Sequence, residues 1–395
     1  MRRKLLVLVF CTLVLTGCWN RRELNTLGIV YGIGVDKDNE TGELILTTQV
    51  VRAGALKQEG PSEEAPIEIV TARGDTAFEA LRKISMEFDR KPFYAQNKVL
   101  VIDEQLAREG IMPMLDFFKR DHEMRSLVWV LIAKNTRARD ILGVEKGLED
   151  IQAVYLENII EISKWNAKAT TVNLLEFIKK VSASGIHPIA GPVEIIEERN
   201  LPAEEKMGLA TKGVKLSGTA VFKGDKLVGY LDEIETRGLN WATGKVKSGI
   251  IHVPSIDGNG KDKQIAIEIK RARASIKPEI KDGKFFFTIE VKAEGDVGAQ
   301  QGRTDTSDIA LFEKLEKELG KGIEKEIRMA IDKVQKEYRS DIFGFGSALN
   351  KKYPKEWNQV KDDWEDIFPR IQYSIKVDAR LRRTGLILKP IMPAE

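Results

Sequence analysis

The feature that most constrains the fold is a change of hydrophobic period within the last third of the chain. Apolar and polar residues alternate from Phe285 to Val291 and again from Ile371 to Leu381, and this period of two predicts half-buried strands. Between these segments, from about residue 305 to 338, apolar residues recur every three or four positions, which predicts one long amphipathic helix. The apolar stripe of such a helix needs a sheet face to cover it. We therefore expect a C-terminal antiparallel sheet, with a further strand from Ile265 to Ile269, packed against one long helix.

The first two hundred residues mix strand and helix patterns. Runs rich in Ile, Val and Thr predict strands, and apolar residues at helical spacing predict helices. The expected strands span residues 27–35, 43–52, 67–71, 98–102 and 127–133, and the expected helices span residues 75–90, 110–119, 137–144, 151–164 and 170–183. This order predicts an α+β domain that ends near residue 200.

Two polar, Gly- and Pro-containing breaks, at residues 200–213 and 254–263, divide the remaining chain. Between them we expect a hairpin that turns at Gly224 and Asp225, followed by a helix. The predicted fold class is α+β and multi-domain, with three domains and mostly antiparallel sheets. The expected domains are an N-terminal domain at 18–200, a middle domain at 201–255 and a C-terminal domain at 256–395.

The extreme N-terminus has the parts of a cleaved export signal. The basic residues at positions 2–4 are followed by eleven apolar residues, then by Thr16, Gly17 and Cys18. Eleven residues make a helix of roughly 17 Å, too short to cross a hydrocarbon core of about 30 Å. We expect residues 1–17 to be a signal peptide, and Cys18 to carry diacylglycerol and a fatty acyl group such as palmitate. The alternative is an ordinary secretory signal or a short anchor in which Cys18 is incidental.

Cleavage at this point would also change the cysteine content and the net charge of the chain. The chain has two cysteines, and Cys11 would leave with the signal, so the mature protein would have no disulfide, no thiolate metal site and no cysteine nucleophile. The formal net charge of +3 would become zero, because the signal removes three basic residues and no acidic one. A neutral body is a poor ligand for nucleic acid. Two acyl chains would contribute on the order of 20 kcal/mol to membrane binding.

No pattern of catalytic or metal-binding residues stands out. The histidines at positions 122, 187 and 252 are scattered, without partners at metal-ligand spacing. The segment Asp36–Gly42 resembles a calcium loop, but its glycine is at position 7 and Thr47 occupies the place of the bidentate Glu, so a plain hairpin turn is favoured. The chain has no Gly-x-Ser-x-Gly elbow and no phosphate-binding loop. We expect no enzyme activity, no metal and no cofactor other than the lipid on Cys18.

A small set of residues could contact a partner. Arg380, Arg382 and Arg383 could form a basic patch for an acidic partner or a membrane surface, although a solvated, salt-bridged strand face is favoured. The glycines beside Phe343 and Phe345 could bring backbone close to another surface or could form a packed turn. Trp357, seven residues before Trp364, could be an exposed anchor or a core residue.

Several segments resemble the Ger(x)C family, the lipoprotein C subunits of bacterial spore germinant receptors. They keep their order over nearly the whole mature chain. They are Cys18–Asn25, Gly28–Asp36, Phe222–Leu231, Glu235–Gly238 with Trp241, Asp341–Gly346, Pro354 with Trp357, Trp364 with Phe368, and Arg382–Gly385. Asn20 departs mildly from the pattern, since the family more often has Asp after the Trp.

The resemblance implies a function and a location. Such proteins are non-enzymatic subunits of nutrient receptors, anchored by lipid at the outer face of the spore inner membrane. They act with a multi-spanning A subunit and a transporter-like B subunit, and the family fold is described as three α+β domains. This chain is therefore expected to couple nutrient sensing to spore germination, as a membrane-tethered partner of the A and B subunits.

Two other functions stay open at this point. The chain could be an extracytoplasmic solute-binding lipoprotein that captures a nutrient itself, although such proteins have parallel sheets with ligands at the strand ends, and the C-terminal pattern predicts an antiparallel one. A hydrolase is a more distant alternative, since no nucleophile–base pair is visible.

Overall fold

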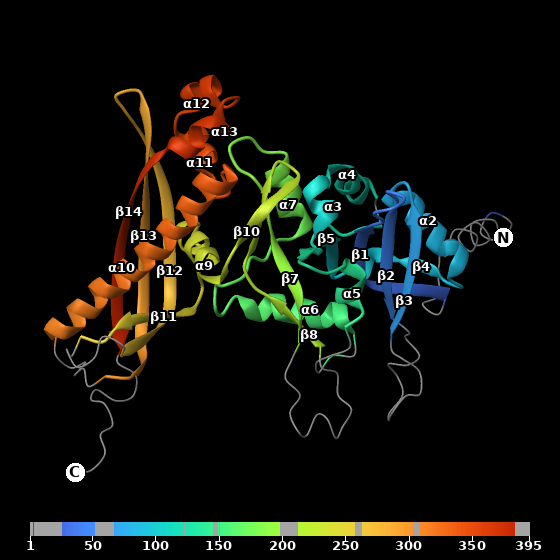
Figure 1. Cartoon of the computed structure of the whole chain (residues 1–395), viewed down its shortest axis with the longest axis horizontal. Coiled ribbons are helices and arrows are strands. Elements are labelled where there is room, and N and C mark those ends of the chain that lie inside the picture. Colours follow the sequence, from blue (N-terminus) through green and yellow to red (C-terminus); the bar gives the residue numbers. More distant parts are fainter. Residues whose placement is uncertain are drawn as a thin grey trace, which may run out of the picture.

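The computed structural model shows an elongated molecule with two sheets placed end to end (Figure 1). It describes Arg3, Glu149 and the ranges 26–51, 67–121, 123–144, 151–197, 212–256, 263–302 and 309–383. Figure 1 shows the larger sheet, in blue and green, at the N-terminal end of the molecule. The smaller sheet, in yellow to red, occupies the C-terminal end, with helix α10 lying across it.

The larger sheet has ten strands and mixed direction. Its central strands β1, β5, β6 and β7 are parallel, whereas the strands flanking them pair antiparallel, apart from the short β4, which runs parallel to β1. The order is β10-β9-β7-β6-β5-β1-β2-β3, with β4 on β1 and β8 on β7. The strands are β1 (Leu27–Lys37), β2 (Leu44–Val51), β3 (Ile67–Gly74), β4 (Lys91–Phe93), β5 (Val99–Asp103), β6 (Trp129–Ala133), β7 (Ile189–Glu197), β8 (Lys212–Leu216), β9 (Thr219–Lys223) and β10 (Lys226–Leu231).

Helices cover both faces of this sheet, which explains why its central strands are apolar throughout. In β5, Leu100 and Ile102 face one core cluster, while Val99 and Val101 face the other. The first face is covered by α2 (Ala77–Glu87), α3 (Glu104–Glu109), α4 (Met112–Arg120) and α7 (Leu174–Val181), and the second by α5 (Ala138–Leu142) and α6 (Gln152–Ser163). The short 3-10 turn η3 (Tyr94–Gln96) follows β4.

The C-terminal sheet has four strands in the order β11-β12-β13-β14. They are β11 (Gly249–Pro254), β12 (Gln264–Lys281), β13 (Lys284–Gln300) and β14 (Gln372–Arg383). The period-two segments of the sequence are indeed strands of one sheet. However, β14 runs parallel to β13, so the expectation of a fully antiparallel sheet was wrong. The reason is the long connection between them, which crosses the sheet and returns the chain to the same end.

The predicted long helix is α10 (Ile309–Lys333), and it packs on the apolar face of this sheet. Its apolar stripe is half-buried at Phe312, fully buried at Leu315, Leu319, Ile323, Ile327 and Ile331, and continues at the buried Val334 after the helix. The helix continues into a π-helical turn, η4 (Val334–Tyr338). The remaining elements are α9 (Glu233–Ala242), α11 (Phe345–Lys352), α12 (Pro354–Val360), α13 (Trp364–Ile367) and the 3-10 turn η5 (Phe368–Arg370).

The segment predicted as a middle domain contributes strands to both sheets. The hairpin β9–β10 and strand β8 join the larger sheet, whereas β11 pairs with β12 in the C-terminal sheet. Helix α9 lies between them and contacts α10. The three-domain division of the chain stays a prediction.

The predicted α+β class is confirmed. No helix in the described ranges is long and apolar enough to cross a membrane.

Candidate functional site at the junction of the two sheets

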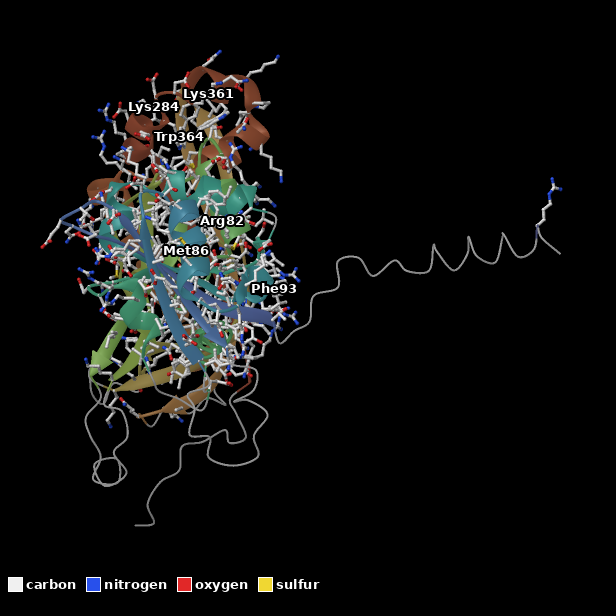
Figure 2. The ribbon with its side chains drawn as sticks, turned by 90° about the vertical axis from the view of Figure 1, so that its right-hand side faces the viewer. Arg82, Met86, Phe93, Lys284, Lys361 and Trp364 are labelled. Atoms are coloured by element: carbon white, nitrogen blue, oxygen red, sulfur yellow. The ribbon has the colours of Figure 1, made fainter. Side chains whose placement is uncertain are left out.

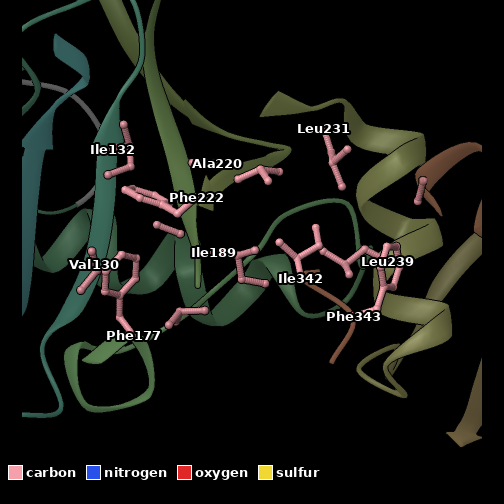
Figure 3. Close-up of a cluster of buried hydrophobic side chains, with 14 of the residues drawn as sticks. Val130, Ile132, Phe177, Ile189, Ala220, Phe222, Leu231, Leu239, Ile342 and Phe343 are labelled. Carbon is pink, nitrogen blue, oxygen red and sulfur yellow. The ribbon is translucent and has the colours of Figure 1, made fainter. Parts of the chain in front are cut away.

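The segments that carry the family resemblance in the middle and last parts of the chain meet where the two sheets join. Figure 3 shows this region, with Phe222, Leu231 and Leu239 close to Ile342 and Phe343 in one continuous apolar cluster. Residues from β6, β7, β9 and α7 extend the cluster into the larger sheet. The junction is therefore a shared core and not a flexible hinge between two separate cores.

A buried carboxylate holds the loop between η4 and α11. Asp341 is 1% exposed, and its side chain accepts the backbone N–H groups of Gly344, Phe345 and Gly346 at 2.7, 3.1 and 2.8 Å. It also accepts the indole N–H of Trp364 at 3.0 Å. Burial raises the pKa of Asp341, while these four donors act in the opposite direction. One side chain thus fixes the start of α11 and docks it on α13.

Two glycines let this loop touch the larger-sheet part of the chain. A Cβ atom on Gly346 would lie 2.6 Å from the Cα of Gly185, and Gly185 itself has φ +77°. The backbone N–H of Ser347 donates to the carbonyl oxygen of Gly185 at 2.9 Å, and the N–H of His187 donates to that of Asp341 at 2.7 Å. The glycine–aromatic motif is therefore a packed turn against the protein's own backbone.

Side chains from the C-terminal part also cap the β9–β10 hairpin. The Tyr338 hydroxyl donates to the carbonyl oxygen of Tyr230 at 2.8 Å and accepts its backbone N–H at 3.2 Å. The Ser340 hydroxyl donates to the carbonyl oxygen of Phe222 at 2.6 Å. These bonds tie the edge of the larger sheet to the end of α10.

A buried ion pair joins α9 to α10. The Arg237 guanidinium donates to both carboxylate oxygens of Glu326, with 2.8 Å between Nε and Oε2, and also to the carbonyl oxygen of Ile250 at 2.7 Å. The indole of Trp241 donates to the same carboxylate at 3.1 Å. Gly238 makes the close crossing possible, since a Cβ there would lie 2.0 Å from the Glu326 carbonyl oxygen. A buried pair of this kind is costly to break from one side only.

The predicted aromatic contact residues lie inside the protein. Phe343, Phe345 and Trp357 are at most 4% exposed, so Trp357 is not an exposed anchor and the two phenylalanine rings face the interior. Phe345 stacks on Phe287 at 4.7 Å between ring centroids, and Trp357 meets Trp364 edge-on at 5.1 Å. The core-packing alternative describes all three, because each fills the space between the C-terminal sheet and the helices after α10.

Two of the predicted basic residues, Arg380 and Arg382, are exposed on β14. Arg380 pairs with Glu316 and Asp378, and Arg382 pairs with Glu294, at 2.8–3.4 Å. This is the salt-bridged strand face of the sequence analysis, and a partner contact there stays a prediction. The side chain of Arg383 and all of Cys18 lie outside the described residues.

Neither of the two described histidines lies in a cluster of metal-ligating residues. His187 accepts the backbone N–H of Gly224 through Nδ1 at 3.0 Å, and burial lowers its pKa. His252 is exposed on β11, and His122 lies outside the described residues. No group of three or more His, Cys, Asp or Glu residues in the described ranges could hold a metal ion. The carboxylates at the junction accept hydrogen bonds from internal donors, so this site holds elements together.

Sequence reasoning singled out Asp341 and Arg237 only as parts of motifs and Tyr338 only as the end of the apolar stripe of the long helix, and it missed Glu326 altogether. Glu326 resembles any polar residue of an amphipathic helix, and its partner is 89 positions away in the chain. Only a three-dimensional arrangement shows that these residues meet.

Comparison with known proteins identifies the chain as a spore germination protein. Residues 20–195 match the family model described as "Spore germination protein N-terminal domain", and residues 217–385 match "Spore germination B3/ GerAC like, C-terminal". Together these two models span most of the chain, and it belongs to the Ger(x)C family, as the resemblance predicted.

Relatives and a solved structure agree along the full length. Spore germination protein KC of Bacillus subtilis (strain 168) is 28% identical, covering 98% of this chain and 96% of the relative. Spore germination protein B3 of the same organism is 26% identical, covering 98% and 99%. The crystal structure of the GerBC protein has a TM-score of 0.52 at 22% identity, covering 91% of this chain and 99% of that one, and it shows the same fold.

Proposed function

We propose that this protein is a lipid-anchored, non-enzymatic subunit of a spore germinant receptor, acting with membrane-embedded A and B subunits to couple nutrient sensing to germination. The observation that carries the proposal is that both halves match spore germination families, and motifs within the C-terminal match pack against the N-terminal one in one buried junction. A subunit that transmits a signal between partners needs such continuity. The junction carboxylates of Asp341 and Glu326 are occupied by internal donors, which suits a scaffold.

The proposed anchor is a lipid on Cys18, which would hold the protein at the outer face of the spore inner membrane. Strand β1 begins at Leu27, nine residues after Cys18. Even a fully extended segment of nine residues spans only about 30 Å. The larger sheet would therefore lie near the membrane, with the C-terminal sheet at the other end of the molecule.

The anchor is tested by Cys18→Ala in spores, with membrane fractionation and a nutrient germination assay. We expect the variant to leave the membrane fraction and germination to slow strongly. Cys18→Ala keeps the folded body unchanged, so circular dichroism of the purified variant is the folding control. Normal germination with unanchored protein would contradict the proposal.

A second function, direct nutrient capture, gains one observation from the structure. A polar cleft of about 520 Å³ lies at the carboxyl ends of the parallel strands β5 and β6, lined among others by Asp103, Arg108, Asn135 and Arg137. Ligands of α/β proteins commonly bind at such strand ends. Calorimetric titration with amino acids and sugars tests it, and saturable heat that Arg137→Ala abolishes would favour capture over the scaffold role.

A further inference from the structure

A second concave surface lies at the end of the molecule farthest from the C-terminal sheet. It is a groove of about 710 Å³ between α2 and α4. Its walls are one stripe from each helix, at helical spacing. The stripe of α2 includes Phe78, Leu81, Arg82 and Ser85, and that of α4 consists of Pro113, Asp116, Phe117 and Arg120. Figure 2 views the molecule from this end, with Arg82 and Met86 labelled on α2.

The groove keeps large apolar side chains in contact with solvent. Phe78 is 46% exposed, and Phe117 on the facing helix is half-buried. The rings of Phe78 and Phe117 meet across the groove at 5.5 Å between centroids, and the Arg82 guanidinium lies 5.0 Å from the Phe78 ring centroid. Solvent-exposed apolar side chains that gather in a concave surface indicate a binding site more than isolated ones do.

A buried polar group on the wall is left without a partner. Tyr94 is 2% exposed, it lines the groove, and its hydroxyl has no hydrogen-bond partner among the described residues. Burial raises the pKa of Tyr94, so the hydroxyl keeps its proton and can donate. An unpartnered buried hydroxyl costs about 1–3 kcal/mol, which an incoming hydrogen-bond acceptor would recover.

The groove lies where the chain enters the folded body. Its wall includes Lys91 and Pro92 of β4, which pair with Leu27 and Gly28 at the start of β1. With Cys18 lipidated, as the proposed function has it, the groove would lie within about 30 Å of the membrane. A partner embedded in the membrane would reach this end of the molecule first.

We propose that this groove receives an amphipathic helix of a membrane-embedded receptor subunit, a step that rests on the proposed function. The stripe of α2 extends over about 12 Å, the length of eight helical residues, so about two turns of a docked helix can lie along the groove, over the contact between α2 and α4. The helix would place an apolar side chain against Phe78 and Phe117 and a hydrogen-bond acceptor at the Tyr94 hydroxyl.

The charges at the rim favour a protein over a lipid surface. Lys91 pairs with Glu123 at 2.9 Å, and Arg120 pairs with Asp116 at 2.7 Å. Paired charges of both signs give no net attraction to anionic headgroups, whereas a helix can meet them with its own charges of both signs.

The test places a photoreactive p-benzoylphenylalanine at position 78 of the full, lipidated chain in spores. The control carries it at position 165, where Trp165 is 71% exposed just after α6, a helix that packs on the opposite face of the sheet from α2 and α4. We expect a cross-link to a multi-spanning receptor subunit at least fivefold stronger from position 78. A cross-link only to lipid, to residues 18–25 of the same chain or to a second copy would overturn the proposal, as would equal cross-links from both positions.

Co-purification from detergent-solubilised membranes separates this proposal from the proposed function. If the wild-type chain captures receptor subunits, Phe78→Ser and Tyr94→Phe should each lower the captured amount at least threefold, while Trp165→Ser should not change it. Unchanged capture by both groove variants would overturn the proposal that the groove binds a receptor subunit, and would leave the proposed function intact. If the wild-type chain captures no receptor subunit, the proposed function itself fails.

Discussion

Two buried aspartates illustrate how single residues hold this fold. Asp341 accepts four N–H donors and organises the loop at the junction. Asp36, at the end of β1, accepts the backbone N–H groups of Ala138 and Arg139 at 2.7 and 3.0 Å, at the start of α5. Both side chains are at most 1% exposed, so their protonation and their acceptors affect stability directly.

Asp341→Asn should destabilise the protein strongly. The amide has one acceptor oxygen and turns a donor toward backbone N–H groups. We expect the free energy of unfolding of the mature body, made soluble with Cys18→Ala, to fall by about 2–4 kcal/mol in urea titrations. The control Asp366→Asn removes an exposed carboxylate that pairs with Arg339 and should cost less than about 0.5 kcal/mol. Equal losses in both variants would contradict the role given to Asp341.

Asp36 should make stability depend on pH. Burial, with a smaller contribution from Asp103, raises its pKa to about 6, although Arg137 and the two N–H donors lower it. Because the folded-state pKa lies above that of the unfolded chain, this contribution is full below about pH 4 and is lost as pH rises through 6. The free energy of unfolding of the wild type, relative to Asp36→Asn, should fall by about 3 kcal/mol from pH 4 to pH 7. A constant difference across this range would contradict the assignment.

Secondary-structure elements show what the sequence could and could not predict. The stripe of α10 and the alternation in β13 and β14 were sufficient to predict that helix and these strands, since local periodicity reports burial. The direction of β14 was mispredicted, because alternation is the same in parallel and antiparallel strands; the long helical connection before β14 was the signal for a parallel pair. Sheet membership of β8–β11 depends on pairing between distant segments and has no local signal.

The candidate site, too, was predictable from the sequence only in part. The motifs at Glu235–Gly238 and Asp341–Gly346 were visible in the sequence, but their joint position at the junction was not. A packed turn was favoured around Phe343 and Phe345 and core packing for Trp357, but the sequence left a contact with another surface open, because an aromatic side chain has the same sequence signature in both. The ring contacts in the folded chain decide it, since Phe345 stacks on Phe287 and Trp357 meets Trp364.

The crossing of α9 and α10 gives a test at the scale of elements. In Gly238→Ala the new Cβ would meet the Glu326 carbonyl oxygen, so the two helices must separate and strain the Arg237 pair. We expect a loss of roughly 3 kcal/mol or more in the free energy of unfolding. The matched variant Gly322→Ala, in α10, meets its nearest neighbour at 3.7 Å and should leave stability unchanged or raise it by up to about 1 kcal/mol. A mild effect at Gly238 would contradict the close crossing.

The whole molecule is an elongated body with the start of β1 toward one end (Figure 1). The larger sheet carries the groove beside the start of β1, the junction forms a continuous core, and the C-terminal sheet with α10 makes the other end (Figure 1). Such an arrangement can transmit a displacement along its length without an internal hinge. This fits a receptor subunit that is held at a membrane and joins partners there.

Affinity capture of the full, lipidated chain from detergent-solubilised spore membranes, with the co-purifying chains identified and quantified, tests the receptor-subunit role most directly. The account predicts that multi-spanning A and B receptor subunits co-purify in a fixed ratio to this chain, and that the folded variant Cys18→Ala captures them less. The account would be contradicted if the wild-type chain were recovered without these subunits.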